Sequence, residues 1–414
     1  MKIIRLHGLV IKVVGIILSL NSLTGCSVSS DNITPLEIND NLYIVDVDHA
    51  GKTERILYST LFDTLKTIIL DTTQAPLIGS IDKMVVYNDA LFILDWTQAK
   101  VLYMFDFEGN FVRKFGAKGG GPGEYAGLAD FTIDTDNNII YLFDNQRHRI
   151  NAYDIVSGNF LRSIDLDRKD GVLSHHIQYV NGSIFADAYF STPSPDNFLL
   201  RKIDLLTGEQ QASFLNADRY NKGWTDLNII DSPVFCKLNA DTVLFTHKFM
   251  DQVIMISKQT VKPYLELKGK DLMRFKDVKN IDQNQDYFNI VMELRNLNRI
   301  YNIRSCVKYG DSIFIECRKG GNFLSVLFDI KTGKTKYVYL KDDLLFTSVN
   351  TNGFLPSFGC ATSEGQFYFI DSDKVNDLKI SIENGRLSPD VDQFDRLKTL
   401  NDNANPVIFF YRYK

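Results

Sequence analysis

The chain has 414 residues, a formal net charge of −5 from 46 basic and 51 acidic residues, and 12% aromatic residues. No basic run stands out, so nucleic acid is not an expected partner, and the aromatic content with only ten Pro argues against a disordered chain. The length exceeds what one compact core usually supports, which favours repeated units that pack only on their neighbours.

Residues 1–25 have the pattern of a cleaved export signal. Three basic residues precede the apolar stretch Val13 to Leu20: Lys2, Arg5 and Lys12. That stretch is shorter than the roughly 20 apolar residues that a membrane-spanning helix needs. The next residues, Leu23 to Cys26, resemble the lipobox of bacterial lipoproteins, in which the Cys becomes the lipidated first residue of the mature chain. An ordinary signal peptide with a chance Cys is the alternative.

We therefore expect residues 26–36 to form a lipidated tether and residues 37–414 to form the folded domain. Acyl chains bind a membrane through their buried methylene groups, and no later segment is apolar and long enough to cross a bilayer. This pattern predicts a protein held on the cell envelope by its N-terminal lipid, with the outer membrane as the expected location.

Six short apolar strands recur along the chain, each after a turn rich in Asn, Asp or Gly. They are residues 91–95, 140–144, 183–187, 242–246, 312–316 and 366–370. Alternating apolar residues and frequent turn residues are typical of antiparallel sheet, and the turn residues tolerate the positive φ of tight hairpins. The first two strands end 49 residues apart (144 − 95), close to the length of a four-stranded blade. We predict an all-β, six-bladed β-propeller.

Two segments depart from the strand pattern and predict short helical decorations on the outside of the ring. Apolar residues in 282–298 recur at helical spacing, and 388–400 begins with Ser388 as a predicted N-cap. The last strand, 406–413, is expected to pair beside an early strand such as 43–47 or 65–70. That pairing would close the propeller with strands from both termini.

The stretch from Lys118 to Tyr125, with 131–134, 140–144 and Arg149-Ile150, resembles an NHL-type repeat. The whole chain resembles the six-bladed propeller lipoproteins of Bacteroidetes, whose lipobox and C-terminal Asn-Pro-Val-Ile sequence it shares. The Pro that usually follows the Gly-Pro-Gly-Glu loop is absent, and Leu128 to Asp130 stands there instead. The resemblance implies the fold and the lipid anchor but little about the ligand, because this fold serves many functions.

Alignment of the blades on their hairpin turns predicts a polar cluster at the mouth of the central channel. The first strand of each propeller blade lines the channel, so equivalent positions converge on the axis. One such column contains Asp82, Asp130, His175 and Arg304, with His176 beside it. Converging polar groups in a concave mouth are the default hypothesis for a binding site. The carboxylates suit a divalent cation and the Arg an anionic ligand; a channel lining that pairs with itself is the alternative.

Two loop residues are added to this candidate site. Glu124 follows the Gly-rich stretch 119–123, which lacks the Lys-Ser/Thr and the helix of a phosphate-binding loop and reads as a turn between blades. Trp224 lies in the long insertion 216–232 and could stack on a sugar ring, although aromatic residues more often anchor their own loop.

Three cysteines, Cys236, Cys306 and Cys360, align two residues further along the first strands. They lack the close spacing of common zinc sites, and we interpret them as small apolar fillers between crowded strands. A disulfide between Cys306 and Cys317 would need a β-bulge, because the two are diagonal in the hairpin register. The sequence leaves that bond open.

These observations favour an envelope lipoprotein that acts as a non-catalytic ligand- or protein-binding module. An envelope protein or glycan would dock on loops 116–130, 188–197, 216–232 and 346–358. The alternatives are a purely structural partner of an envelope assembly, and a metal-assisted hydrolase or lyase of the six-bladed class, similar to lactonases. The enzyme would need at least three carboxylate or amide ligands at strand starts, whereas the sequence offers two, and common hydrolase motifs are missing. No cofactor is therefore assigned, with a divalent cation as the alternative.

Overall fold

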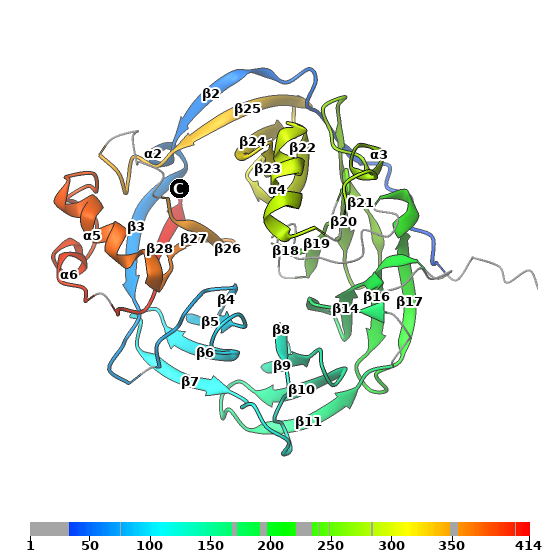
Figure 1. The fold of residues 1–414 in the computed structure, drawn as a ribbon, viewed down its shortest axis with the longest axis horizontal. Coiled ribbons are helices and arrows are strands. Elements are labelled where there is room, and N and C mark those ends of the chain that lie inside the picture. Colours follow the sequence, from blue (N-terminus) through cyan, green and yellow to red (C-terminus); the bar gives the residue numbers. More distant parts are fainter. Residues whose placement is uncertain are drawn as a thin grey trace, which may run out of the picture.

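The computed structural model describes residues 33–74, 76–167, 172–190, 197–220, 234–239, 241–247, 249–282, 285–347, 355–401 and 403–414. Six antiparallel sheets stand radially around a central axis (Figure 1). The predicted six-bladed β-propeller is therefore confirmed, and each of the six recurring apolar segments is the second strand of a blade.

Blades 1 to 3 take their strands from one continuous stretch each. Blade 1 contains β4 (Lys83–Tyr87), β5 (Ala90–Asp95), β6 (Val101–Asp106) and β7 (Phe111–Phe115). Blade 2 contains β8 (Leu128–Asp134), β9 (Ile139–Asp144), β10 (Arg149–Asp154) and β11 (Phe160–Asp165). Blade 3 contains β13 (Ile177–Val180), β14 (Ser183–Asp187), β16 (Phe198–Asp204) and β17 (Gln210–Asn216), with the small ladder β12 (Val172–Leu173) and β15 (Tyr189–Phe190) beside it.

Blades 4 to 6 each include a strand from the N-terminal segment. Blade 4 contains β18 (Phe235–Asn239), β19 (Thr242–Phe245), β20 (Gln252–Ile256), β21 (Val261–Lys268) and, parallel to β21, β1 (Tyr43–Asp46). Blade 5 contains β22 (Ile300–Tyr309), β23 (Ser312–Lys319), β24 (Asn322–Asp329), β25 (Lys334–Lys341) and, parallel to β25, β2 (Gly51–Leu57). Blade 6 contains β26 (Ser357–Ala361), β27 (Gly365–Ile370), β28 (Val407–Tyr413) and β3 (Phe62–Ile69).

The C-terminal strand β28 pairs antiparallel with β3, from Val407 opposite Ile69 onward, so both ends of the chain contribute to blade 6. This is the pairing expected for residues 65–70. The other early segment, 43–47, pairs instead with the outer edge of blade 4. The N-terminal segment thus follows the outer edges of three consecutive blades.

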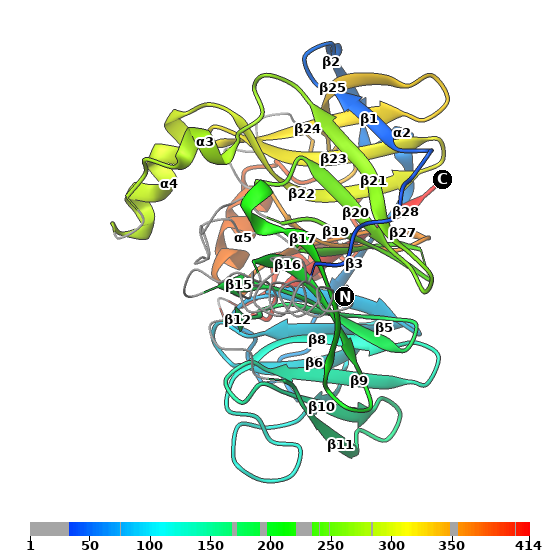
Figure 2. The ribbon, with the colours of Figure 1, turned by 90° about the vertical axis from the view of Figure 1, so that its right-hand side faces the viewer.

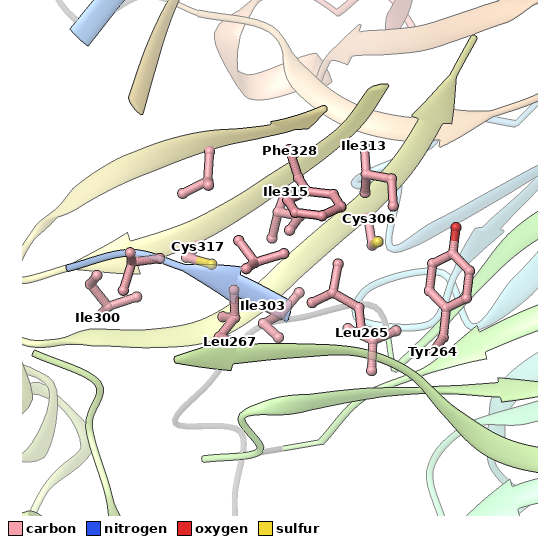
Figure 3. Close-up of a cluster of buried hydrophobic side chains, with 14 of the residues drawn as sticks. Tyr264, Leu265, Leu267, Ile300, Ile303, Cys306, Ile313, Ile315, Cys317 and Phe328 are labelled. Atoms are coloured by element: carbon pink, nitrogen blue, oxygen red, sulfur yellow. The ribbon is translucent and has the colours of Figure 1, made fainter. Parts of the chain in front are cut away.

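Apolar clusters fill the interfaces between neighbouring blades. Such clusters lie between blades 1 and 2, 2 and 3, 3 and 4, 4 and 5, and 6 and 1. In the interface of blades 4 and 5, Leu265 and Leu267 from β21 face Ile303 and Ile315 (Figure 3). Each sheet is stable only because its neighbours bury its faces.

The helices lie outside the blades. They are α2 (Tyr58–Leu61), α3 (Phe275–Val278), α4 (Tyr287–Asn296), α5 (Val375–Glu383), α6 (Phe394–Lys398), and the 3₁₀ turns η1 (Ala217–Arg219) and η2 (Ser372–Lys374). The helix expected in 282–298 is α4, which projects from one face of the ring rather than covering its outer wall (Figure 2). None of the helices in the described ranges has the length and apolar character needed to cross a membrane.

The second helical prediction was only partly right. Helix α6 begins at Phe394, and Ser388 forms a turn in which its hydroxyl oxygen accepts the N–H of Asp390 at 3.3 Å, so Ser388 is not an N-cap. Helix α5, which the sequence reading missed, buries Leu378 and Ile382 with Leu397 of α6 against blade 6.

Candidate functional site

Buried aspartates end the second strands of blades 1 to 3 and hold the chain where it enters each blade. They are Asp95, Asp144 and Asp187, and each is fully buried. Asp187 Oδ1, for example, accepts the backbone N–H groups of His175 and His176 at 2.8 and 2.9 Å. A buried carboxylate needs such donors to offset its desolvation, so these aspartates define the level at which each first strand begins.

The first strands are in register with these aspartates and not with the hairpin turns. Lys83, Asp130 and Ile177 lie opposite Leu94, Phe143 and Ala186, the residues just before the three aspartates. The turn from Asp134 to Ile139 is two residues longer than the turn from Tyr87 to Ala90. Alignment on the turns is therefore wrong by one or two residues, and Asp130 is level with Lys83 and Ile177 instead of Asp82 and His175.

Asp130 links three blades. Its Oδ1 lies 2.8 Å from Lys83 Nζ in blade 1, and its Oδ2 accepts the N–H of Ile177 in blade 3 at 2.8 Å. Asp130 is 1% exposed. Both of its oxygens are thus engaged inside the fold, which gives this carboxylate a structural role between the inner strands.

Asp82 closes the turn that follows β5. Its Oδ2 accepts the N–H groups of Trp96 and Thr97 at 2.8 and 2.9 Å, and its Oδ1 accepts the Thr97 hydroxyl at 2.9 Å. A divalent cation needs several free oxygen ligands, whereas the oxygens of Asp82 and Asp130 already accept protein donors. Within the described ranges, no group of three or more His, Cys, Asp or Glu side chains could hold a metal ion.

Aromatic and imidazole rings gather where blade 3 meets blade 4. The exposed His175 ring lies edge-on to Tyr189, with ring centres 5.2 Å apart, and Tyr189 lies 4.8 Å from His247 of blade 4. His176, half-buried beside them, places Nδ1 2.6 Å from Asp187 Oδ2. We call His175, His176, Tyr189 and His247 the imidazole cluster.

The contact between His176 and Asp187 changes the pKa values of both groups. Burial disfavours the charged imidazole, but the Asp187 carboxylate outweighs it and raises the pKa of His176 above its ordinary value. Burial also disfavours the charged carboxylate, but His176 outweighs this effect and lowers the pKa of Asp187. Asp130 also favours the charged form of His176, and the nearby Lys83 opposes it.

The other predicted site residues have contacts of their own. Arg304 Nη1 lies 2.9 Å from Glu316 Oε1 in blade 5, and the guanidinium covers the Phe323 ring at 4.7 Å. Glu124 Oε2 accepts the N–H of Gly121 at 2.6 Å, which closes the Gly-rich loop on itself. Trp224 lies outside the described residues.

The structure therefore groups Asp130, His175 and His176 around the start of β13, while Asp82, Glu124 and Arg304 take part in separate contacts. The sequence reading missed Lys83, Asp187, Tyr189 and His247. Asp187 had a visible signal, because Asp ends the second strand in three consecutive blades.

The cysteines are packing residues. In the described ranges, Cys236, Cys306, Cys317 and Cys360 are free thiols. Cys306 lies opposite Ile315 and Cys317 opposite Ile303, so the two thiols are not cross-strand partners. Both belong to the apolar cluster between blades 4 and 5 (Figure 3), where burial raises the pKa of Cys317 to about 12.

Two solved structures share the fold. The “Putative exported protein” of Bacteroides fragilis superposes with a TM-score of 0.69 and 19% identity over 90% of this chain and 99% of that one. A member of the duf4221 family from Bacteroides vulgatus gives a TM-score of 0.51 and 13% identity over 85% and 97%. A comparison with curated proteins finds no match. Residues 42–412 match the model named “Domain of unknown function (DUF4934)”, and the chain belongs to this family.

Proposed function

We propose that this protein is an exported, lipid-anchored component of the cell envelope that acts as a non-catalytic binding module. The export signal and Cys26 in the sequence support the anchor. The fold shared with an exported-protein candidate from Bacteroides fragilis is consistent with an envelope location. The propeller then presents one face of its ring to a partner in the aqueous space.

This proposal rests on which polar groups near the channel mouth already have partners within the fold. Both oxygens of the buried Asp130 accept protein donors, and the exposed Asp82 closes the turn that follows β5. His175 is exposed, and Asp187 orients the half-buried His176 through one ring nitrogen. The mouth therefore offers hydrogen-bond donors to a ligand without a complete catalytic arrangement.

The charge of the imidazole cluster indicates which chemical group of a ligand it would bind. The raised pKa of His176 increases its positive charge, whereas the nearby Lys83 ammonium already donates to both Asp130 oxygens and to the Phe131 carbonyl. A charged imidazole suits an acidic group. We expect an envelope protein or glycan that presents a carboxylate or phosphate to the imidazole cluster.

Capture from envelope extracts tests the binding surface. A chain of residues 27–414, immobilised through its N-terminus, is compared with the double variant His175→Ala/His176→Ala, and the captured proteins and glycans are quantified by mass spectrometry. We expect a specific partner whose capture falls at least tenfold in the double variant. His49→Ala is the matched control, because His49 also pairs with an aspartate at 2.8 Å. That aspartate, Asp46, is the last residue of β1 and does not belong to the imidazole cluster. Equal capture by all three proteins contradicts the proposal.

Metabolic labelling with palmitate tests the anchor separately. The full chain should incorporate the label and sediment with membranes, whereas Cys26→Ser should do neither. Labelling of both chains, or of neither, would show that Cys26 is not the lipidated residue.

A metal-assisted hydrolase or lyase is the second candidate. One observation favours it, because a carboxylate that orients an imidazole, as Asp187 orients His176, is an arrangement used in acid–base catalysis. Metal analysis of the purified chain separates the candidates. A stoichiometric divalent ion that is lost in Asp82→Ala and Asp130→Ala would favour the enzyme over the binding module.

A further inference from the structure

The interface between blades 5 and 6 differs from the other five. Its apolar cluster is built by blade 6 with α2, α5, α6 and residues 344–346, and the blade 5 sheet contributes only Leu340 from its outer strand. The interface also contains a pocket, lined on one side by β22 to β25 and on the other by α2, β3 and β26 to β28. In Figure 1 this position lies between β23 and β27.

The blade 5 wall of the pocket carries a polar row. Ser305, Glu316 and Ser325 are cross-strand neighbours on β22, β23 and β24, so their side chains share one face of the sheet. The residues on the opposite face, Cys306, Ile315 and Val326, form an equivalent row that packs against blade 4. Blade 5 is therefore apolar toward blade 4, whereas its face toward blade 6 carries this polar row beside the apolar Val307 and Phe314.

The blade 6 wall carries a chain of hydrogen bonds. The Tyr58 hydroxyl donates to the Tyr368 hydroxyl at 3.1 Å, which donates to Gln366 Oε1 at 2.9 Å. Gln366 Nε2 donates to the Tyr413 hydroxyl at 2.9 Å. These groups hold one another in place, and hydroxyl groups of this kind both donate and accept.

Aromatic rings and a compensated charge complete the pocket. Phe314 and Phe358 contribute apolar walls. The Glu316 carboxylate, with its side chain 30% exposed, is paired with Arg304 at 2.9 Å, so the pocket has little net charge. The cavity has a volume of ≈ 40 Å³, which is room for about three waters.

From this geometry we propose that the pocket between blades 5 and 6 binds the hydroxyl-bearing edge of a single neutral sugar ring, such as the terminal residue of a glycan. Hydroxyl groups on that edge enter the space, where they donate to Glu316 and exchange hydrogen bonds with Ser305, Ser325 and Gln366. Apolar side chains in this interface, as in the other five, would pack more tightly than these polar ones. Polar residues in place of apolar packing are expected at functional sites. The site is separate from the imidazole cluster.

Saturation-transfer NMR tests this proposal on residues 27–414. The probes are D-glucose, D-galactose, D-mannose, L-fucose and N-acetyl-D-glucosamine, each titrated to 50 mM. We expect at least one sugar to bind with a millimolar Kd, and Ser325→Leu, which fills the pocket, to weaken that binding at least tenfold. Tyr368→Phe, which removes a hydroxyl but keeps the ring, should weaken it severalfold. The control Ser312→Leu changes a serine on β23 outside the pocket and should stay within twofold of the unaltered chain.

The outcomes separate this proposal from the binding module at the channel mouth. His175→Ala/His176→Ala should leave sugar binding unchanged. If none of the five sugars binds, or if binding persists in both Ser325→Leu and Tyr368→Phe, the sugar site is refuted whatever the capture experiment shows. Thermal melting identifies any variant that fails to fold, and Tyr368→Phe then decides the result, because it leaves the packing of the pocket intact.

Discussion

Replacing Asp130 by Ala tests whether a residue predicted to bind a ligand is a structural link between blades. The Ala variant leaves the N–H of the buried Ile177 without its acceptor at 2.8 Å, which costs about 1–3 kcal/mol. It also leaves Lys83 without its counter-ion. Loss of one partner from a fully buried pair costs about 3–5 kcal/mol, but Lys83 is 24% exposed and can turn toward water. We expect the free energy of unfolding to fall by about 3 kcal/mol.

Urea denaturation followed by circular dichroism measures this loss. Asp130→Asn keeps an acceptor for Ile177 and should lose less than the Ala variant. Asp165→Ala is the matched control in the same blade, because Asp165 pairs with Arg149 at 2.6 Å but is 75% exposed, and exposed pairs contribute at most about 1 kcal/mol. If Asp130→Ala is no less stable than Asp165→Ala, the link between blades does not contribute as described.

Three further predictions use the same kind of matched comparison. Gly208→Ala should lower the free energy of unfolding by about 2 kcal/mol more than Gly333→Ala in urea denaturation, roughly the cost of a steric clash in a packed site. Both glycines have positive φ, so their backbone strain cancels, but only at Gly208 would a Cβ collide with a backbone oxygen, that of Asp165. His176 has a raised pKa, so its stabilisation is complete below its unfolded pKa of about 6.5 and is lost as pH rises through the folded value. The stability difference between the unaltered chain and His176→Ala should therefore be larger at pH 5.5 than at pH 9, and a constant difference would contradict the pairing with Asp187. Thiol titration of residues 27–414 should find four reactive thiols in urea. Cys306 and Cys317, which are 3% and 1% exposed, should stay unreactive in the native chain. Fewer than four reactive thiols in urea would indicate a disulfide.

The blade count could be predicted because each second strand has a strong local pattern. Residues 91–95 and 140–144 are buried apolar runs that end in Asp, and they follow turn residues with positive φ, such as Asn88 and Asn138. Helix α5 lacked a comparable signal, because it is held by packing against blade 6 rather than by a side-chain cap. Local periodicity identifies strands better than it identifies short helices that depend on tertiary packing.

The register of the first strands could not be predicted from the turns. Turn lengths differ between blades, and bulges interrupt the pairing near Leu128 and again at Ile303. The contacts between blades keep a constant spacing instead, since Lys83 to Asp130 and Asp130 to Ile177 are both 47 residues apart. Which residues meet at the channel is therefore set by contacts between blades. The sequence pattern within a single blade carries no information about those contacts.

The way in which the ring closes explains why one interface can be polar. Between blades 5 and 6 the chain itself crosses from β2 to β3 through α2, and Asp343, just after β25, accepts the N–H and the hydroxyl of Ser59 at 3.0 and 2.6 Å. These two blades are thus joined by continuous backbone and partly buried hydrogen bonds, in addition to the apolar packing of α5 and α6 against blade 6. Because the closure does not depend on apolar contact between the inner strands, serines, Gln366 and Glu316 can occupy that space with a smaller loss of stability than elsewhere in the ring. A binding pocket at the point of closure is therefore the arrangement that this topology tolerates best.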